Sequence, residues 1–151
     1  MGFRGSFEHA FDDKGRVSVP VRFRDEIRTH GDDRVVITRF ISPNVRCLDV
    51  YPYPTWIELE EKFRAKARFD PRVARLRRFY FSNACDCTLD KQGRMSVPIE
   101  LRDYAGIRKD VRFVSDFDRF QLWDPQAWAT IDRDDEQVLS DDPSFLAEIG
   151  I

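Results

Sequence analysis

The chain has 151 residues, the length of one ordinary domain or of two very small ones. Hydrophobic residues make up 42% of it and Phe occurs 13 times, so the chain can bury a core and disorder throughout is excluded. The formal net charge is −2, but residues 132–151 carry seven acids against one base, and the other residues carry 24 bases against 20 acids. With a pI near 5.7, the protein is not coated uniformly in positive charge, so any nucleic-acid surface must be local.

The length of the apolar runs and the number of cysteines indicate the cellular compartment. Apolar runs such as residues 35–37 are too short to span a bilayer, and residues 1–6 lack the apolar stretch of a signal peptide. Three cysteines cannot all pair within one chain, which favours a reducing environment. We therefore expect a cytoplasmic protein without a membrane partner.

An internal repeat organises the chain. Residues 12–20, Asp-Asp-Lys-Gly-Arg-Val-Ser-Val-Pro, align with residues 90–98, Asp-Lys-Gln-Gly-Arg-Met-Ser-Val-Pro. Further along the chain, the offset between aligned residues of the two copies falls by six. We attribute this change to a longer loop around residues 42–44 of the first copy. The predicted divisions are a first repeat at 1–52, a helical connector at 53–80, a second repeat at 81–131 and an acidic tail at 132–151.

Each copy is expected to contain a strand, a tight turn, a short strand, a helix and two further strands. In the first copy, residues 6–12 alternate between the two faces of a strand, and residues 12–15 have the composition of a turn. Residues 16–19 form the short strand, and Pro20 suits the first turn of a helix that ends near His30. The remaining predicted elements are strands at 34–40, 48–51, 111–114 and 120–123 and a helix at 98–105.

The connector and the C-terminal region carry helix signals. Thr55 and Glu58 have the spacing of a capping box, and Asp70-Pro71 starts a second helix after a break. Asp124-Pro125 opens a comparable helix after the second copy. The last ten residues or so are expected to be loosely structured.

The paired turn motif is the strongest functional signal. A single copy is explained by a hairpin with an Asp–Arg salt bridge over its turn, but the fold alone does not require an outward Arg in both turns. Arg16 follows Asp12 by four residues, and Arg94 follows Asp90 in the same way. An Arg held by an acid on a rigid turn is a preorganised fork for guanine O6 and N7 or for a phosphate.

These motifs, each followed by Val-Pro, closely resemble the MraZ family. The resemblance also covers the opening Phe3-Arg4-Gly5, the helical connector and Phe79-Tyr80-Phe81. It implies an α+β fold of two tandem AbrB-like swapped-hairpin (SpoVT-AbrB) β-α-β repeats joined by a helical connector. It further implies a nucleoid-associated, sequence-specific DNA-binding transcriptional regulator of the bacterial division and cell-wall gene cluster, which acts as a ring-shaped homo-oligomer on spaced promoter repeats.

The expected DNA-binding residues come from both turns. Two arginines read base edges or grip the backbone, and two aspartates orient them. A lysine and two serines add phosphate contacts, and two glycines complete the turns. These residues are Arg16, Arg94, Asp12, Asp90, Lys14, Gly15, Gly93, Ser18 and Ser96. We expect no cofactor, no small-molecule substrate and no catalytic residue, because no nucleotide-binding, nucleophile-elbow or zincin motif is present.

Two further features leave alternatives open. The connector holds eight bases against the single acid Asp70 within residues 62–78. Arg68, Arg72 and Arg75 would share one helix face, which is either a solvated or subunit-facing stripe that pairs with acids such as the tail, or a phosphate contact. The acidic tail also permits a rival function, an antitoxin-like protein-binding module whose tail masks a partner protein.

The cysteines raise the question of a metal. Cys85 and Cys87 lie on one face of a strand, yet only Cys47 and two distant histidines could complete a metal site. The repeat aligns both with core-facing positions of the first copy, where Cys acts as a small hydrophobic residue. We therefore expect structural cysteines and no metal.

Overall fold

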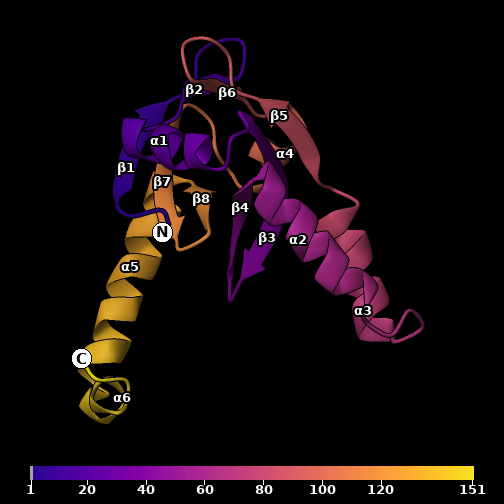
Figure 1. The fold of residues 1–151 in the computed structure, drawn as a ribbon. Coiled ribbons are helices and arrows are strands. Elements are labelled where there is room, and N and C mark those ends of the chain that lie inside the picture. Colours follow the sequence, from indigo (N-terminus) through magenta and orange to yellow (C-terminus); the bar gives the residue numbers. More distant parts are fainter. Residues whose placement is uncertain (1) are drawn as a thin grey trace.

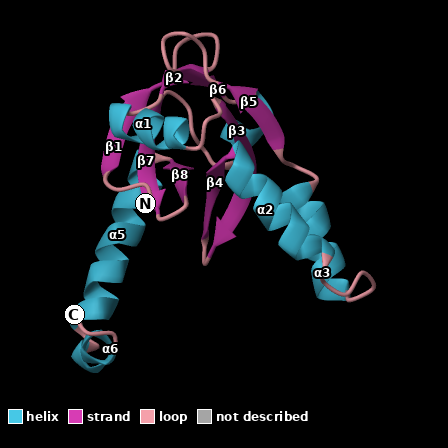
Figure 2. Ribbon diagram, viewed as in Figure 1, coloured by secondary structure: helices cyan, strands magenta, loops and turns pink. Residues whose placement is uncertain are grey.

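The two copies of the repeat fold into the same succession of elements, as Figures 1 and 2 show. The computed structural model describes residues 2–151. The first copy comprises β1 (Ser6–Ala10), β2 (Arg16–Ser18), α1 (Val21–Thr29), β3 (Arg34–Ser42) and β4 (Val45–Pro52). The second comprises β5 (Cys85–Thr88), β6 (Arg94–Ser96), α4 (Ile99–Tyr104), β7 (Asp110–Asp116) and β8 (Arg119–Trp123). Between them lie α2 (Tyr53–Arg64), α3 (Pro71–Leu76) and the π-helical turn η1 (Arg77–Phe81), and α5 (Pro125–Ser140) and α6 (Pro143–Glu148) follow the second copy.

The copies exchange their first strands. The main sheet has the order β1-β7-β8-β4-β3-β5, so β1 pairs with the second copy and β5 with the first. At the centre, β4 pairs with β8, and the short strands β2 and β6 form a separate two-stranded sheet. This pairing confirms the predicted α+β fold of two tandem swapped-hairpin repeats. Neither copy has a complete sheet without the other.

The main core lies on one face of the six-stranded sheet. Alternation along the strands places Ile37, Leu48 and Phe120 on this face, where α1, α4 and the β2–β6 ribbon cover them. Phe23 of α1 is fully buried, and its ring centroid lies 4.9 Å from that of Phe120. Because every element of both copies contributes to this core, the two repeats form one folding unit.

A second, smaller core lies on the opposite face, beneath the connector. Trp56 of α2 and Tyr80 of η1 pack on Tyr51 of the sheet, and these three aromatic side chains are buried. Asp49 of β4 is also fully buried there, and its carboxylate accepts hydrogen bonds from Tyr80 Oη at 2.5 Å and from Gln121 Nε2 at 2.8 Å. The connector is thus fixed to the sheet by aromatic packing and by a buried polar network.

The extra residues of the first copy lie in its strands, so the predicted longer loop is wrong. The β3–β4 hairpin turns at residues 43–44, and the β7–β8 hairpin turns at residues 117–118. Both connections therefore contain two residues. β3 and β4 have nine and eight residues, whereas β7 and β8 have seven and five.

Two expectations for the connector are corrected. Thr55 is not a helix cap, because α2 begins at Tyr53 with Pro52 in the N-cap position and without a side-chain cap. Arg68 lies in the turn between α2 and α3, so it does not share a helix face with Arg72 and Arg75. The predicted start at Asp70 is confirmed, since its carboxylate accepts a hydrogen bond from the backbone N–H of Arg72 at 2.8 Å.

The C-terminal region is helical, contrary to the expectation of a loosely structured end. Asp124 caps α5 by accepting a hydrogen bond from the backbone N–H of Ala127 at 3.0 Å, and α5 continues to Ser140. The short helix α6 follows it. Figure 1 shows α5 leaving the sheet on one side and α2 and α3 leaving it on the other, with both projections directed away from the β2–β6 ribbon. Within residues 2–151, no helix combines the length and apolar character needed to cross a membrane.

Candidate functional site

The two turns lie side by side at one end of the molecule, above the β2–β6 ribbon (Figures 1 and 2). In this ribbon, Arg16 is paired with Ser96 and Ser18 with Arg94. Paired residues of antiparallel strands share a face, so these four side chains line the outer face, and the inner residues between them are buried. The structure therefore brings the predicted arginines and serines of the two copies together on one surface.

Each turn is built around its aspartate. Asp12 Oδ1 accepts hydrogen bonds from the backbone N–H groups of Lys14 and Arg16, both at 2.9 Å. In the second turn, Asp90 Oδ1 accepts the corresponding two bonds, again at 2.9 Å. Gly15 and Gly93 have φ values of +75° and +73°, a conformation that favours glycine. The sequence thus specifies one rigid turn twice.

The second carboxylate oxygen of each aspartate holds the arginine. Arg16 Nε donates to Asp12 Oδ2 at 2.8 Å, and Arg94 Nε donates to Asp90 Oδ2 at the same distance. Arg94 Nη1 also lies 3.9 Å from Asp12 Oδ2, so the charges of the two turns meet. The arginine side chains remain 32% and 27% exposed. Each guanidinium is therefore anchored through Nε, while part of each arginine side chain stays exposed.

The anchoring aspartates are stabilised in their ionised form. The backbone N–H of Arg16 is the largest influence that holds the pKa of the Asp12 carboxyl below its usual range, and the Arg16 side chain acts in the same direction. The pKa of Asp90 is lowered in the same way by Arg94. Both turns consequently carry a full carboxylate against each guanidinium at neutral pH.

Two further arginines, which the sequence analysis missed, lie against the turns across the repeat boundary. A Cβ atom on Gly15 would lie 2.9 Å from Nη2 of Arg102, which belongs to α4 of the other copy. A Cβ atom on Gly93 would overlap the side chain of Arg24, which belongs to α1. Arg24 and Arg102 occupy matching positions in the repeat, and that match was the available signal. The match alone does not show that these arginines reach the turns. They do so because the swapped strand pairing places each helix against the turn of the other copy.

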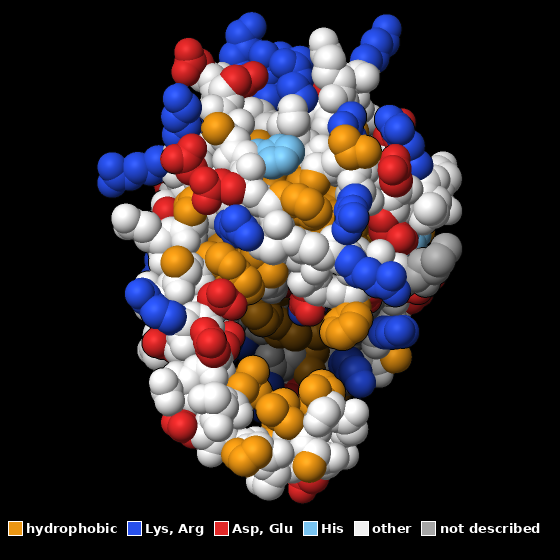
Figure 3. Space-filling model, turned by 90° about the vertical axis from the view of Figure 1, so that its left-hand side faces the viewer, with side chains coloured by type: hydrophobic (Ala, Val, Ile, Leu, Met, Phe, Trp, Pro, Cys, Tyr) orange, Lys and Arg blue, Asp and Glu red, His pale blue; other side chains and the backbone are white. Residues whose placement is uncertain are grey.

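The remaining predicted residues contribute exposed polar groups. Lys14, Ser18 and Ser96 are exposed on or beside the turns. The backbone carbonyl of Ser18 accepts a hydrogen bond from His9 Nδ1 at 2.7 Å. Figure 3 shows Lys and Arg side chains gathered at the end of the molecule that carries the turns. The site is therefore an exposed surface with two anchored guanidinium forks, and Lys and Arg side chains gather at the same end of the molecule.

The cysteines lie in or against the core. Cys47 is fully buried, and burial raises the pKa of its thiol to about 12. Cys85 and Cys87 are half-buried and pack against the main core, as the repeat alignment predicted. Within residues 2–151, no group of three or more His, Cys, Asp or Glu side chains is arranged to hold a metal ion.

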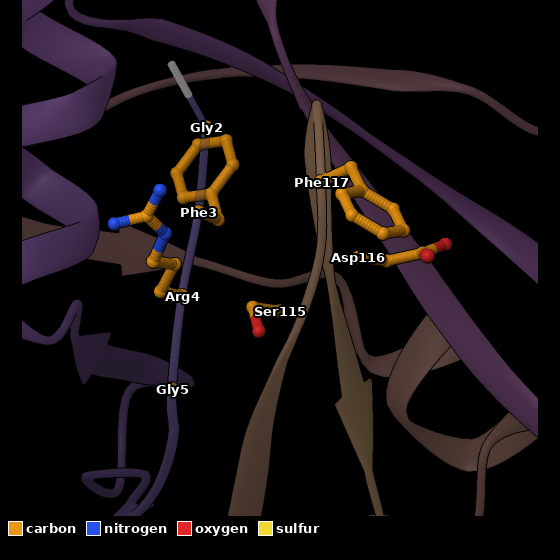
Figure 4. Close-up of a pocket in the computed structure, with 7 residues that line it drawn as sticks. All are labelled: Gly2, Phe3, Arg4, Gly5, Ser115, Asp116 and Phe117. Atoms are coloured by element: carbon orange, nitrogen blue, oxygen red, sulfur yellow. The ribbon is translucent and has the colours of Figure 1, made fainter. Parts of the chain in front are cut away.

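One hollow lies apart from the turns, beside the β7–β8 hairpin. It has a volume of about 400 Å³, and Figure 4 shows the residues around it. Arg4 and Asp116, its only charged residues, point to opposite sides. The hollow therefore contains no converging set of polar groups of the kind that binds a small molecule.

Comparisons with known proteins agree with the duplication of the repeat. The family model described as "MraZ protein, putative antitoxin-like" matches residues 2–79 and again residues 80–144. A protein of Desulfitobacterium hafniense (strain DSM 10664 / DCB-2) is 38% identical over 149 residues, which is 99% of each chain. A protein of Thermomicrobium roseum is 40% identical over 148 residues, 98% of this chain and 97% of the relative, and one of Nitrosomonas eutropha is 36% identical over 126 residues, 83% of each. All three are named "Transcriptional regulator MraZ". With two family matches that together span most of its length, the chain belongs to the MraZ family.

Proposed function

We propose that the protein is a DNA-binding transcriptional regulator that recognises its operator through the two turns. The observation that carries this proposal is the pair of guanidinium forks, each fixed through Nε by a carboxylate oxygen at 2.8 Å and placed on the same outer face. The names of the relatives support the regulatory role.

The geometry suits base and phosphate recognition. An arginine anchored through Nε loses little side-chain entropy on binding, and its two outer nitrogens match guanine O6 and N7 or a phosphate. Arg16 and Arg94 would make these contacts, while Asp12 and Asp90 hold them in orientation. Lys14, Ser18 and Ser96 lie where they would add contacts to the DNA backbone. Gly15 and Gly93 would act indirectly, because their positive φ values keep the turns in shape.

Several copies acting together would extend a small contact surface. One chain offers two turns, less than the surface that a typical specific DNA complex buries. A ring-shaped homo-oligomer would present several such pairs to spaced promoter repeats, and linked sites gain affinity through effective concentration. Following the family resemblance, the proposed targets are genes of the division and cell-wall cluster, and the proposed location is the cytoplasm, at the nucleoid.

The proposal is tested by gel shift on the DNA upstream of the gene, with light scattering on the same samples. We expect Arg16→Ala to abolish specific binding, because a lost base contact costs about 1–3 kcal/mol and recurs in every engaged copy. Arg16→Lys should restore binding only in part, since a lysine replaces the charge but not the fork. Arg108→Ala, at an exposed arginine outside the turns, is the matched control.

The mass of each variant separates a DNA contact from a structural role. If Arg16→Ala loses specific binding at unchanged mass and melting temperature, the arginine acts on DNA. If it dissociates the assembly instead, the arginine is a scaffold residue and the proposal fails. Unchanged binding would also contradict the proposal, and the basic connector would then be the leading candidate.

A further inference from the structure

The C-terminal helices expose an apolar stripe that the rest of the chain covers only in part. At the start of α5, Trp128 packs on Trp123 with ring centroids 5.3 Å apart, and Ile131 lies in the same cluster. Val138 follows Ile131 by seven residues, two helical turns, and thus continues the same face, but it is 66% exposed. The stripe therefore continues beyond the surface that covers it.

The exposed apolar surface continues onto α6. Phe145 on α6 and Ile149, the residue directly after that helix, are 43% and 55% exposed. In Figure 3, apolar side chains line a hollow on the side of the molecule that carries α5, and more of them lie on the lowest lobe, which is α6. Exposed apolar side chains gathered on two neighbouring helices are typical of an interaction surface.

The charge around this patch restricts its partner. We call residues 125–148 the acidic arm, because seven acids lie around the stripe or, at Asp135, within it: Asp132, Asp134, Asp135, Glu136, Asp141, Asp142 and Glu148. In the part of the chain that the structure describes, none of the seven forms an ion pair. A partner that buries the stripe must therefore offer apolar side chains surrounded by bases.

This chain itself carries such a surface. We call residues 62–78 the basic arm, which holds eight bases and the single acid Asp70. Phe69 at its tip is 93% exposed. Beside it, a hollow of about 270 Å³ has apolar walls from Phe63 and Val73 and a basic rim of Arg64, Lys66, Arg68 and Arg77. An apolar side chain from an acidic helix matches the apolar walls of this hollow and the charge of its rim.

The two arms of one chain lie too far apart to meet, since Figure 1 shows them on opposite sides of the sheet. We propose that the acidic arm of one copy docks on the basic arm of a second copy, an assignment that rests on the proposed assembly of several copies. Because the two contacting surfaces differ, the contact is head-to-tail, and repeated head-to-tail contacts close into a ring when the rotation permits. Neither arm includes the turns, so docking leaves the proposed DNA surface uncovered.

The test is a charge exchange in the full chain. In the acidic arm, Asp134→Lys with Asp141→Lys changes two residues that lie two turns apart beside Val138. A lysine at position 141, the C-cap of α5, is favoured by the helix dipole, and both positions are exposed, so this variant should fold. In the basic arm, Arg68→Glu with Arg77→Glu reverses two exposed residues on the rim of the hollow.

Controls and combinations make the test specific. Asp33→Lys and Arg108→Glu reverse exposed charges outside both arms and should keep the wild-type mass. By light scattering at micromolar concentration, we expect the wild type at a multiple of 17.8 kDa and each arm variant at the mass of one chain. An equimolar mixture of the two arm variants should regain a higher mass, and so should the variant with all four substitutions, because opposite charges then face each other again.

Three results would overturn the docking proposal. The first is that either arm variant keeps the wild-type mass. The second is that the equimolar mixture and the variant with all four substitutions both stay at the mass of one chain. The third is a basic-arm variant that keeps its mass but binds every DNA sequence more weakly, which would make the basic arm a nucleic-acid surface. The role of the turns is decided separately, because Arg16→Ala is scored by specific DNA binding at constant mass.

Discussion

Replacing Gly93 by Ala tests whether the helix of one copy braces the turn of the other. Gly93 has a φ of +73°, and an L-residue in this region costs about 1–2 kcal/mol. Gly106 has a φ of +68°, but a Cβ atom there would meet no atom within 4 Å. Gly106→Ala is therefore a control that carries the backbone cost alone, and the difference between the two variants isolates the displacement of Arg24.

The size of that difference follows from what has to move. At Gly93 the new methyl group would overlap the flexible end of Arg24, not backbone, so the side chain swings away and its contact is lost. We expect Gly93→Ala to lower the free energy of unfolding by about 1 kcal/mol more than Gly106→Ala, the central value for a single substitution. Urea unfolding of the two variants measures this difference.

A double-mutant cycle identifies the partner. In an Arg24→Ala background, Gly93→Ala should cost no more than Gly106→Ala, because the displaced side chain is already absent. In the gel shift, Gly93→Ala should weaken specific DNA binding, whereas Gly106→Ala should leave it unchanged. Equal unfolding costs for Gly93→Ala and Gly106→Ala in the wild-type background would refute the bracing role.

Three further outcomes are expected. Tyr80→Phe removes a donor to the buried carboxylate of Asp49 and should lower the free energy of unfolding by about 1–3 kcal/mol at neutral pH. Burial raises the pKa of Asp49, so the folded state favours the protonated carboxyl, and this contribution to stability is lost as the pH rises through the folded-state pKa. In mild acid the carboxyl is protonated and needs the Tyr80 donor less, so Tyr80→Phe should cost less stability there. Urea unfolding at two pH values checks this. Asp12 and Asp90 have lowered pKa values, so their contribution to the free energy of unfolding is present at neutral pH. It is lost only as the pH falls below the unfolded-state pKa and through the folded-state pKa. The NMR chemical shifts of the turn amides should therefore stay constant in an acid titration until that range is reached. Cys87→Val should cost less than about 1.5 kcal/mol in the same unfolding assay, and zinc analysis of the wild type should show no stoichiometric metal.

Local chemistry made the turns predictable from the sequence. Asp-x-x-Gly-Arg specifies the carboxylate that accepts two backbone N–H groups and the glycine that takes a positive φ, and both depend only on near neighbours. The same holds for the helix start at Asp70, where the capping group lies within two residues of its donor. One prediction failed where two local signals competed. The capping-box spacing at Thr55 competes with Pro54, which lies in the first turn of α2, where proline is favoured, and the helix begins at Tyr53, before the threonine.

The buried network at Asp49 illustrates what sequence reasoning misses. Along β4, Asp49 alternates with apolar residues and has the pattern of a solvent-facing position. It is buried because Tyr80, 31 residues later, folds back over that face and donates to it. Arg119, from the second copy, donates to Tyr51 in the same network. Such a cluster depends on three segments meeting, and no spacing within one of them reveals it.

The duplication also explains why the two turns need not be equivalent. In an assembly of single repeats, both turns of a pair carry identical residues. Here the first turn has Asp13-Lys14 where the second has Lys91-Gln92, and Gln92 Oε1 accepts a hydrogen bond from Arg94 Nη2 at 3.2 Å. Arg94 is thus held by two acceptors, whereas Lys14 leaves an exposed cation beside Arg16. Because the backbone of each turn is set by its own Asp and Gly, the residues between them can differ while the two backbones stay matched, and under the proposed function the two turns would present different side chains to DNA in the same geometry.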